Sequence, residues 1–185
     1  MNLTPYLADV PTTVRERAAR VRLLALDVDG TLTDGRLRFG NDGSEIKAFH
    51  ALDGQGLKLL RDCGIEVALI TARSSELVAR RAAELGIVHV HQGCHDKRAA
   101  LRALCQILAI EPAQIAYMGD DLPDLPALDL AGLAVGPRNA HPWLHPRLHW
   151  MTSAAGGEGA VRMLCDLILD AQDRAGAIVQ RFLGP

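Results

Sequence analysis

The sequence predicts an α/β fold in which a parallel, Rossmann-like sheet is covered by helices on both faces. Short apolar runs alternate with amphipathic stretches along the chain, and several of these runs end in a polar residue. Continuous apolar runs of this length are typical of strands that are buried on both faces of a sheet. With 185 residues, 49% hydrophobic and 23% charged, the chain fits a single globular domain over residues 1–185.

The elements follow one another without an internal repeat or a low-complexity linker. A polar helical lead-in is expected over residues 1–20. Strands are then predicted at 23–26, 66–70, 87–90, 115–118 and 133–135, and helices at 57–63, 75–85, 97–108 and 159–171. Helical connections between parallel strands make right-handed crossovers, which gives the layered sheet its handedness.

One segment interrupts this alternation directly after the first strand. Residues 37–39 and 45–49 read as a β-hairpin, because Asn41, Asp42 and Gly43 between them tolerate positive φ. The hairpin and one helix use nearly all of the chain between Asp27 and Thr71, so no cap domain is expected there.

The hairpin also suggests assembly of several chains. It would project strand edges together with Leu37, Phe39, Ile46 and Phe49, and an isolated hairpin is only marginally stable. Packing of hairpins between subunits would bury these edges and cover an otherwise open site. We therefore expect an oligomer.

Composition excludes several kinds of partner. A net charge of −2 and a pI near 6.4 give no electrostatic reason to expect nucleic acid or an anionic membrane. No stretch approaches the ~20 apolar residues of a membrane span. The four cysteines form no CxxC pair and are expected to be reduced, which favours the cytoplasm.

The chemistry is expected where the predicted strands end, because ligands of open α/β sheets bind at the carboxyl edge. The residues that reach this edge are Asp27, Asp29, Thr71, Lys97, Asp120, Asp121 and Asp124. Carboxylates of this kind suit Mg²⁺, which prefers oxygen ligands. The set predicts phosphoryl transfer, with Asp27 attacking phosphorus and Asp29 protonating the leaving group and later deprotonating water. Thr71 and Lys97 would bind the phosphoryl oxygens.

The same residues resemble the motifs of the haloacid dehalogenase superfamily. Asp27-Val28-Asp29-Gly30-Thr31 is similar to its first motif, and Thr71, Lys97 and Gly119-Asp120-Asp121 match the second, third and fourth. Further similarity, from about residue 21 to 171, is to the family of 3-deoxy-D-manno-octulosonate 8-phosphate (Kdo 8-phosphate) phosphatases, which act in lipopolysaccharide precursor synthesis. It includes Lys47-Ala48-Phe49, Asp53-Gly54 and Gly156-Gly157.

The resemblance implies a role for individual residues. Asp27 and Asp120 would bind Mg²⁺ through their side chains, and Asp29 through its carbonyl. The residues expected to contact the substrate are His50, Ala51, Leu52, Asp53, Gly54, Lys58, Arg73, Arg81 and Lys97. The family forms homotetramers in which the hairpins build a central barrel. The chain departs from the family at Leu52 and Glu158, where arginine is usual, which leaves a nine-carbon ulosonate phosphate open as the substrate.

Other interpretations are less favoured. His89, His91, Cys94 and His95 could bind zinc, but they fit an edge strand with a polar outer face. A receiver domain also clusters Asp, Thr and Lys at strand ends, but in a different chain order. A non-catalytic oligomerisation module of the same fold would not be expected to keep every catalytic position, and related phosphomutases usually carry a cap domain.

Overall fold

In the computed structural model, which describes residues 4–183, a six-stranded sheet forms the centre of the molecule. Its strand order is β5-β4-β1-β6-β7-β8, and every neighbouring pair is parallel. The strands are β1 (Leu23–Leu26), β4 (Glu66–Ile70), β5 (His89–His91), β6 (Ile115–Met118), β7 (Leu133–Gly136) and β8 (Trp150–Met151). The order reverses between β1 and β6, which is the switch point at which such sheets bind ligands. The predicted fold class is therefore confirmed.

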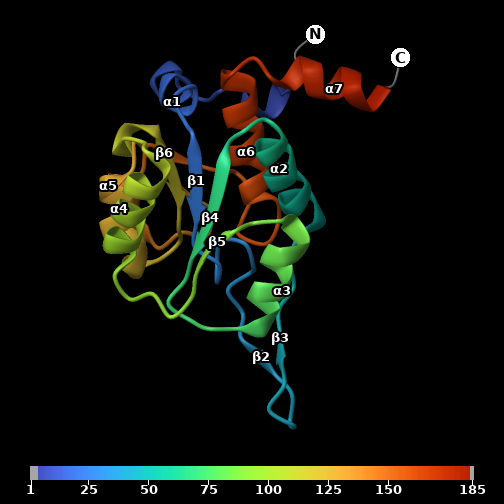
Figure 1. Cartoon of the computed structure of the whole chain (residues 1–185), viewed down its shortest axis with the longest axis vertical. Coiled ribbons are helices and arrows are strands. Elements are labelled where there is room, and N and C mark those ends of the chain that lie inside the picture. The colour runs from blue at the N-terminus through green and yellow to red at the C-terminus, as the bar shows by residue number, and fades with distance from the viewer. Residues whose placement is uncertain (1–3, 184–185) are drawn as a thin grey trace.

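Helices cover both faces of the sheet (Figure 1). One face carries α1 (Thr12–Ala18), α2 (Ala51–Asp62), α3 (Glu76–Leu85) and α6 (Ala160–Ala171), and the other carries α4 (Lys97–Leu108) and α5 (Leu125–Leu130). The last helix, α7 (Ala175–Leu183), packs against α6. Short 3-10 helices lie at Pro5–Leu7, Pro112–Gln114, Leu122–Asp124 and Pro142–Arg147.

Strand β1 shows why the predicted strands are apolar throughout. Leu24 and Leu26 pack into the core beneath α2 and α6, whereas Leu23 and Ala25 pack into the core beneath α4. All four side chains are fully buried. Each buried leucine contributes roughly 1.5–3 kcal/mol relative to an exposed one, so β1 anchors the loop that follows it.

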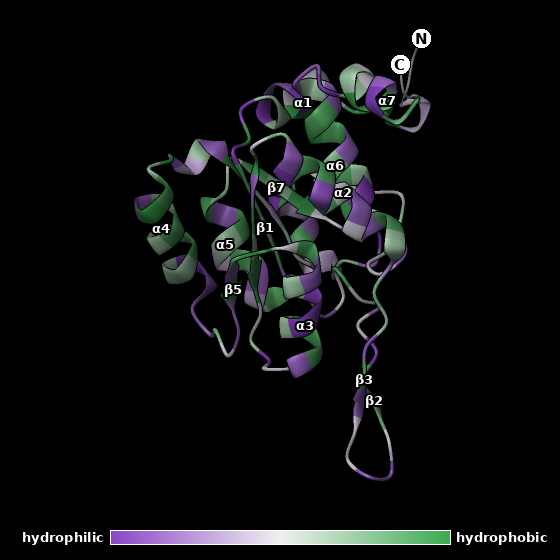
Figure 2. Ribbon diagram, turned by 45° about the vertical axis from the view of Figure 1, so that its right-hand side comes forward, coloured by the Kyte–Doolittle hydropathy of each residue, from purple (hydrophilic) through white to green (hydrophobic). Residues whose placement is uncertain are grey.

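A small antiparallel pair projects from this body (Figure 2). Strands β2 (Arg38–Phe39) and β3 (Glu45–Ile46) pair with each other and with no strand of the main sheet. This is compatible with the expected hairpin, and Leu37, Phe39 and Ile46 are exposed as anticipated. Phe49 differs from the expectation, because it is half-buried and packs against the core.

Several boundaries differ from the sequence-based prediction. Helix α2 begins at Ala51 rather than at residue 57, and β5 spans His89–His91 rather than residues 87–90. Strand β8 and helix α7 were not predicted. None of the helices described between residues 4 and 183 combines the length and the hydropathy that a membrane-spanning helix needs.

Candidate active site

The loops after β1 and β6 meet at the carboxyl edge of the sheet. The backbone N–H of Asp27 donates to the carbonyl of Met118 at 2.9 Å, which continues the β1–β6 register into the site. Gly30 has φ +99°, and a Cβ built on it would lie 2.0 Å from Oδ2 of Asp120. Glycine is therefore needed both for the backbone conformation and for the close approach of the two loops.

Lys97 joins two of the carboxylates. Its ammonium lies 2.5 Å from Oδ1 of Asp27 and 2.6 Å from Oδ1 of Asp124. The side chains of Lys97, Asp27 and Asp124 are 3%, 9% and 2% exposed. Charges this well buried are costly unless they are paired and hydrogen-bonded, so the arrangement indicates a site rather than a solvated surface.

Asp124 organises this cluster, a role that the sequence did not reveal. Its Oδ1 also accepts a hydrogen bond from the hydroxyl of Tyr117 at 2.7 Å. Its Oδ2 accepts from the backbone N–H groups of Asp120 at 3.0 Å and Asp121 at 3.2 Å. Asp124 thus fixes the loop that carries Asp120 while it orients Lys97.

The cluster has an excess of negative charge that fits a metal ion. Asp27, Asp120 and Asp124 each offer a carboxylate oxygen, and these oxygens lie within 4.8 Å of one another. Burial and the charge of Asp124 raise the pKa of Asp27 to about 7, against the opposing effect of Lys97. Burial and the charge of Asp27 raise the pKa of Asp120 to about 7. The single positive charge of Lys97 cannot balance the negative charges of three carboxylates. A divalent cation bound by their oxygens would supply the missing positive charge.

These pKa values predict how the metal-free protein responds to pH. Both carboxyls have folded-state pKa values above the usual 3.8, so the folded state binds more protons than the unfolded state between these values. We therefore expect the melting temperature in chelator to fall as the pH rises from about 5.5 to about 8. Added Mg²⁺ should raise it more at the higher pH, because the metal competes with protons. Differential scanning calorimetry measures both effects.

Asp120→Asn is the control for this experiment, because it removes one of the two titrating carboxyls and should flatten the pH slope. The variant also distinguishes the effect of the carboxyl cluster on stability from the effect of His149. Burial lowers the pKa of His149, so this histidine adds stability as the pH rises. An equal slope in the variant and in the wild-type protein would contradict the assignment.

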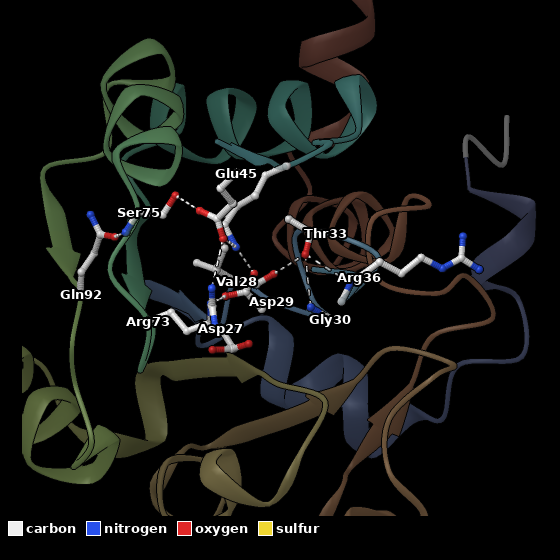
Figure 3. A network of polar contacts seen from close by, with 12 residues as sticks. Asp27, Val28, Asp29, Gly30, Thr33, Arg36, Glu45, Arg73, Ser75 and Gln92 are labelled. Atoms are coloured by element: carbon white, nitrogen blue, oxygen red, sulfur yellow. Dashed lines mark hydrogen bonds and ion pairs between the residues drawn. The ribbon is translucent and has the colours of Figure 1, made fainter. Parts of the chain in front are cut away.

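The remaining predicted catalytic residues reach the same edge. Thr71 follows β4 and is 2% exposed, and its backbone is held by hydrogen bonds with the carbonyl of His91 and the N–H of Cys94, both 2.9 Å. Asp29 points toward Arg73 and Glu45 (Figure 3). One oxygen of Asp29 is hydrogen-bonded by Lys47, and the other lies 3.8 Å from Nε of Arg73.

The loop before α6 supports the loop after β1. The side chain of Asn139 donates to the carbonyl of Gly30 at 3.0 Å and accepts from the N–H of Gly156 at 2.7 Å. A Cβ on Gly156 would lie only 1.8 Å from the carbonyl oxygen of Gly30. The similarity at Gly156-Gly157 therefore has a packing reason, since the two loops touch through their backbones.

The residues expected to contact the substrate do not all line one cavity. Arg81 and Ala51 line a cavity of about 330 Å³ beside the site, together with Lys47, Phe49, Leu77, Arg80 and Glu84. Lys58 and Leu52 are exposed at the surface of α2, and Gly54 is buried where Arg81 approaches it.

His50 and Asp53 lie against the start of α6. A Cβ on Gly159 would be 4.0 Å from the ring of His50. Asp53 is 1% exposed, and its Oδ1 accepts a hydrogen bond from the N–H of Arg162 at 2.7 Å. In this structure Asp53 links α2 to α6, so direct contact between Asp53 and substrate stays a prediction.

The histidines are not gathered into a group of three or more potential ligands in the described part of the chain. There, the one such group close enough to hold an ion is the aspartate cluster. His89 is instead 3.7 Å from Glu66, on the edge strand β5. His149 accepts a hydrogen bond from the N–H of Ala134 at 2.9 Å.

The fold and the site together define a class of enzyme, the haloacid dehalogenase-like hydrolases, whose family model matches residues 41–132. The 3-deoxy-D-manno-octulosonate 8-phosphate phosphatase KdsC of Salmonella typhi is 49% identical over 173 residues, which cover 94% of this chain and 92% of that protein. The KdsC protein of Escherichia coli strain K12 is 48% identical with the same coverage. The chain belongs to the family of 3-deoxy-D-manno-octulosonate 8-phosphate phosphatases within this class.

Solved structures agree with this assignment. The phosphatase of this family from Moraxella catarrhalis, solved in complex with magnesium ion, phosphate ion and Kdo, superposes with a TM-score of 0.89 at 44% identity. The match covers 91% of this chain and 97% of that one. A hypothetical protein from Xanthomonas campestris superposes with a TM-score of 0.94 at 54% identity, covering 97% and 98% of the two chains.

Proposed function

We propose that the protein hydrolyses Kdo 8-phosphate to Kdo and inorganic phosphate through an aspartyl-phosphate on Asp27. The observation that carries the proposal is the buried cluster of Asp27, Lys97, Asp120 and Asp124 at the switch point of the sheet. The family relationship supports the substrate, since the relatives named above are phosphatases of this sugar acid. Residues 1–185 act as one catalytic unit in this proposal, and the expected site of action is the cytoplasm.

In the first step, a carboxylate oxygen of Asp27 attacks phosphorus and the bond between phosphorus and the ester oxygen breaks. Asp29 gives its proton to the departing alkoxide of the sugar. In the second step, Asp29 takes a proton from water, whose oxygen attacks the aspartyl-phosphate. Phosphate leaves, and Asp27 is again a free carboxylate. Each of the two aspartates thus returns to its starting state.

The other side chains bind and orient in this scheme. Lys97 and Thr71 hold the phosphoryl oxygens at the carboxyl edge of the sheet. Asp27 and Asp120, with the main-chain carbonyl of Asp29, are the proposed Mg²⁺ ligands. Mg²⁺ bound there would neutralise the phosphoryl oxygens. Asp124 lies close enough to act as a further ligand or to orient the others.

The sugar carboxylate is proposed to bind near Arg73 and Arg81. Arg81 lines the cavity beside Asp29, and its guanidinium lies 5.8 Å from the centre of the Phe49 ring. A hydrogen bond to a charged group contributes roughly 1.5–3 kcal/mol, which corresponds to about 10-fold to 100-fold in specificity constant. Leu52 leaves α2 without the usual arginine, while Glu158 is 3.6 Å from Arg138. A nine-carbon ulosonate phosphate therefore stays the alternative substrate.

A substrate panel tests this proposal. We expect kcat/KM for Kdo 8-phosphate to exceed that for an uncharged sugar phosphate such as glucose 6-phosphate by roughly 100-fold, because only the former offers a carboxylate to arginine. Arg81→Met should reduce this ratio, whereas the matched change Arg102→Met on the exposed side of α4 should not. Preference for glucose 6-phosphate would refute the proposed substrate, and preference for a nine-carbon ulosonate 9-phosphate would select the alternative.

Assembly is the second part of the proposal. Leu37, Phe39 and Ile46 are 48%, 63% and 57% exposed on a hairpin that leaves the body of the protein. Apolar side chains gathered on a projecting strand pair favour burial against other copies of the chain. A homotetramer joined through its hairpins would bury these apolar side chains.

Light scattering tests the tetramer at micromolar concentration. The wild-type mass should be four times that of the 19.9 kDa chain, and Phe39→Asp with Ile46→Asp should yield smaller species. Arg36→Asp, on the same hairpin and with a 78% exposed side chain, is the control. A wild-type monomer would contradict the assembly but not the chemistry at Asp27.

A further inference from the structure

The hairpin carries a lysine whose side chain lies buried at the active site. Lys47 follows β3, and its side chain is only 3% exposed although the hairpin itself projects into solvent. Its ammonium donates a hydrogen bond to Oδ1 of Asp29 and lies 3.5 Å from Oε1 of Glu45. A lysine loses favourable hydration when it is buried in this way, so its two carboxylate contacts are needed to hold it there.

The two carboxylate oxygens of Asp29 differ in their contacts, because only one of them is bonded to Lys47. Oδ1 is occupied by the ammonium. Oδ2 is buried and has no hydrogen-bond partner among the described residues, with Nε of Arg73 3.8 Å away. A group that transfers a proton needs one oxygen available to the reacting atoms and a fixed orientation. The contact with Lys47 supplies the orientation and leaves Oδ2 without a hydrogen bond among the described residues.

Glu45 fixes Lys47 in turn by joining the hairpin to the loop after β4 (Figure 3). Oε2 of Glu45 accepts a hydrogen bond from the hydroxyl of Ser75 at 2.7 Å, and its Oε1 accepts one from Arg73 at 3.2 Å. The N–H of Ser75 donates to the side chain of Gln92 at 2.6 Å. Residues 45–47, which lead back from the hairpin, are therefore fixed by hydrogen bonds with Asp29, Arg73 and Ser75.

We infer that Lys47 is a positioning residue for the proton transfer by Asp29. The inference rests on the proposed function, in which Asp29 protonates the sugar alkoxide. Without Lys47, the carboxylate of Asp29 would be drawn toward Arg73, which is its other cationic neighbour. The hairpin then contributes to catalysis within its own chain, in addition to any role in assembly.

The test uses two substrates that differ in their need for an acid. Kdo 8-phosphate releases an alkoxide, which must be protonated, whereas 2,4-dinitrophenyl phosphate releases a stable phenolate. For Lys47→Met we expect the single-turnover rate of Kdo release from Kdo 8-phosphate to fall roughly 10-fold to 100-fold with little change in KM, and the rate of the dinitrophenolate burst to fall less than about threefold. Both rates report the first step alone, before Asp29 takes a proton from water in the hydrolysis of the aspartyl-phosphate. Lys47→Arg should recover part of the loss. Arg36→Met, which removes a cation from the exposed part of the same hairpin, is the control.

Comparison of Lys47→Met with Asp29→Asn distinguishes a failure of this inference from a failure of the proposed function. Asp29→Asn should show the same dependence on the leaving group, and its absence there would contradict the role of Asp29 itself. The same pattern in Asp29→Asn but not in Lys47→Met would overturn the inference about Lys47. A rise in KM for Kdo 8-phosphate with kcat unchanged would also overturn it, because Lys47 would then be a substrate contact in the adjoining cavity. The burst of dinitrophenolate from the aryl phosphate shows in each variant that the site is folded.

Discussion

Asp27→Asn is expected to reduce turnover by roughly 10⁴-fold or more, since the uncatalysed hydrolysis of phosphomonoesters has a very large barrier and the amide cannot form the covalent intermediate. The change keeps the shape of the side chain. Its carbonyl oxygen can still accept the hydrogen bond from Lys97, which lies at 2.5 Å in the wild-type protein. Turnover of an aryl phosphate and thermal unfolding, measured on the same preparation, check both expectations.

Folding stability should respond in the opposite direction from turnover. Asp27 is one of three carboxylates that repel one another, and burial raises its pKa to about 7. Removing its charge should therefore leave the melting temperature in chelator unchanged or higher at about pH 8. Asp129→Asn, at an aspartate that pairs with Arg98 on the surface, is the control and should change neither property. Near-normal turnover of the Asp27 variant, with no conversion of asparagine back to aspartate in the mass spectrum, would refute the nucleophile.

The sequence was sufficient to bring the predicted catalytic residues to one edge of the sheet, because two regular features determine their position. Apolar strands and a parallel arrangement bring strand ends to one edge. Asp27 and Thr71 each follow a strand directly, and Asp120 lies two residues after the end of β6. Right-handed crossovers then place the connecting helices on the faces of the sheet. None of these steps depends on the contacts of an individual side chain, so local patterns were enough.

Helix α2 shows what local patterns could not provide. Its start was predicted too late, because Asp53-Gly54-Gln55-Gly56 has the composition of a turn. In the structure both glycines are helical and stand where other elements approach. A Cβ on Gly54 would be 2.2 Å from the guanidinium of Arg81, and one on Gly56 would be 3.0 Å from Cβ of Cys165 in α6. Tertiary packing therefore overrides the helix propensity of these residues.

The roles of Asp124 and Lys47 could not be predicted from the sequence, for a related reason. Asp124 follows Asp120 by one helical turn and could be read as a capping residue, which it also is. Only the fold shows that its other oxygen binds Lys97 and Tyr117. The sequence indicated Lys47 only as part of a motif, since a lysine on a projecting hairpin is usually solvated. The pairing of Lys47 with Asp29 depends on how the hairpin folds back onto the site.

Lys97→Met is expected to reduce turnover and to destabilise the metal-free protein, a combination that Asp27→Asn should not produce. Loss of a donor to the developing phosphoryl charge lowers kcat by roughly 10²-fold to 10³-fold. The variant also leaves Asp27 and Asp124 buried without their cation, and breaking a buried pair from one side costs about 3–5 kcal/mol. Denaturant unfolding in chelator at about pH 8 measures this loss, because that pH lies above the pKa of about 7 of Asp27 in the wild-type protein.

The double variant Lys97→Met with Asp27→Asn decides whether the loss comes from uncompensated charge. If it does, the second change should restore part of the unfolding free energy, and so should a lower pH at which Asp27 and Asp120 are protonated. Added Mg²⁺ should act in the same direction in the single variant, since it neutralises the remaining carboxylates. Lys97 packs its aliphatic part in the site as well, and lost packing alone would not respond to pH, to metal or to the second substitution. A destabilisation that is independent of all three would show that Lys97 holds the fold through contact rather than through charge.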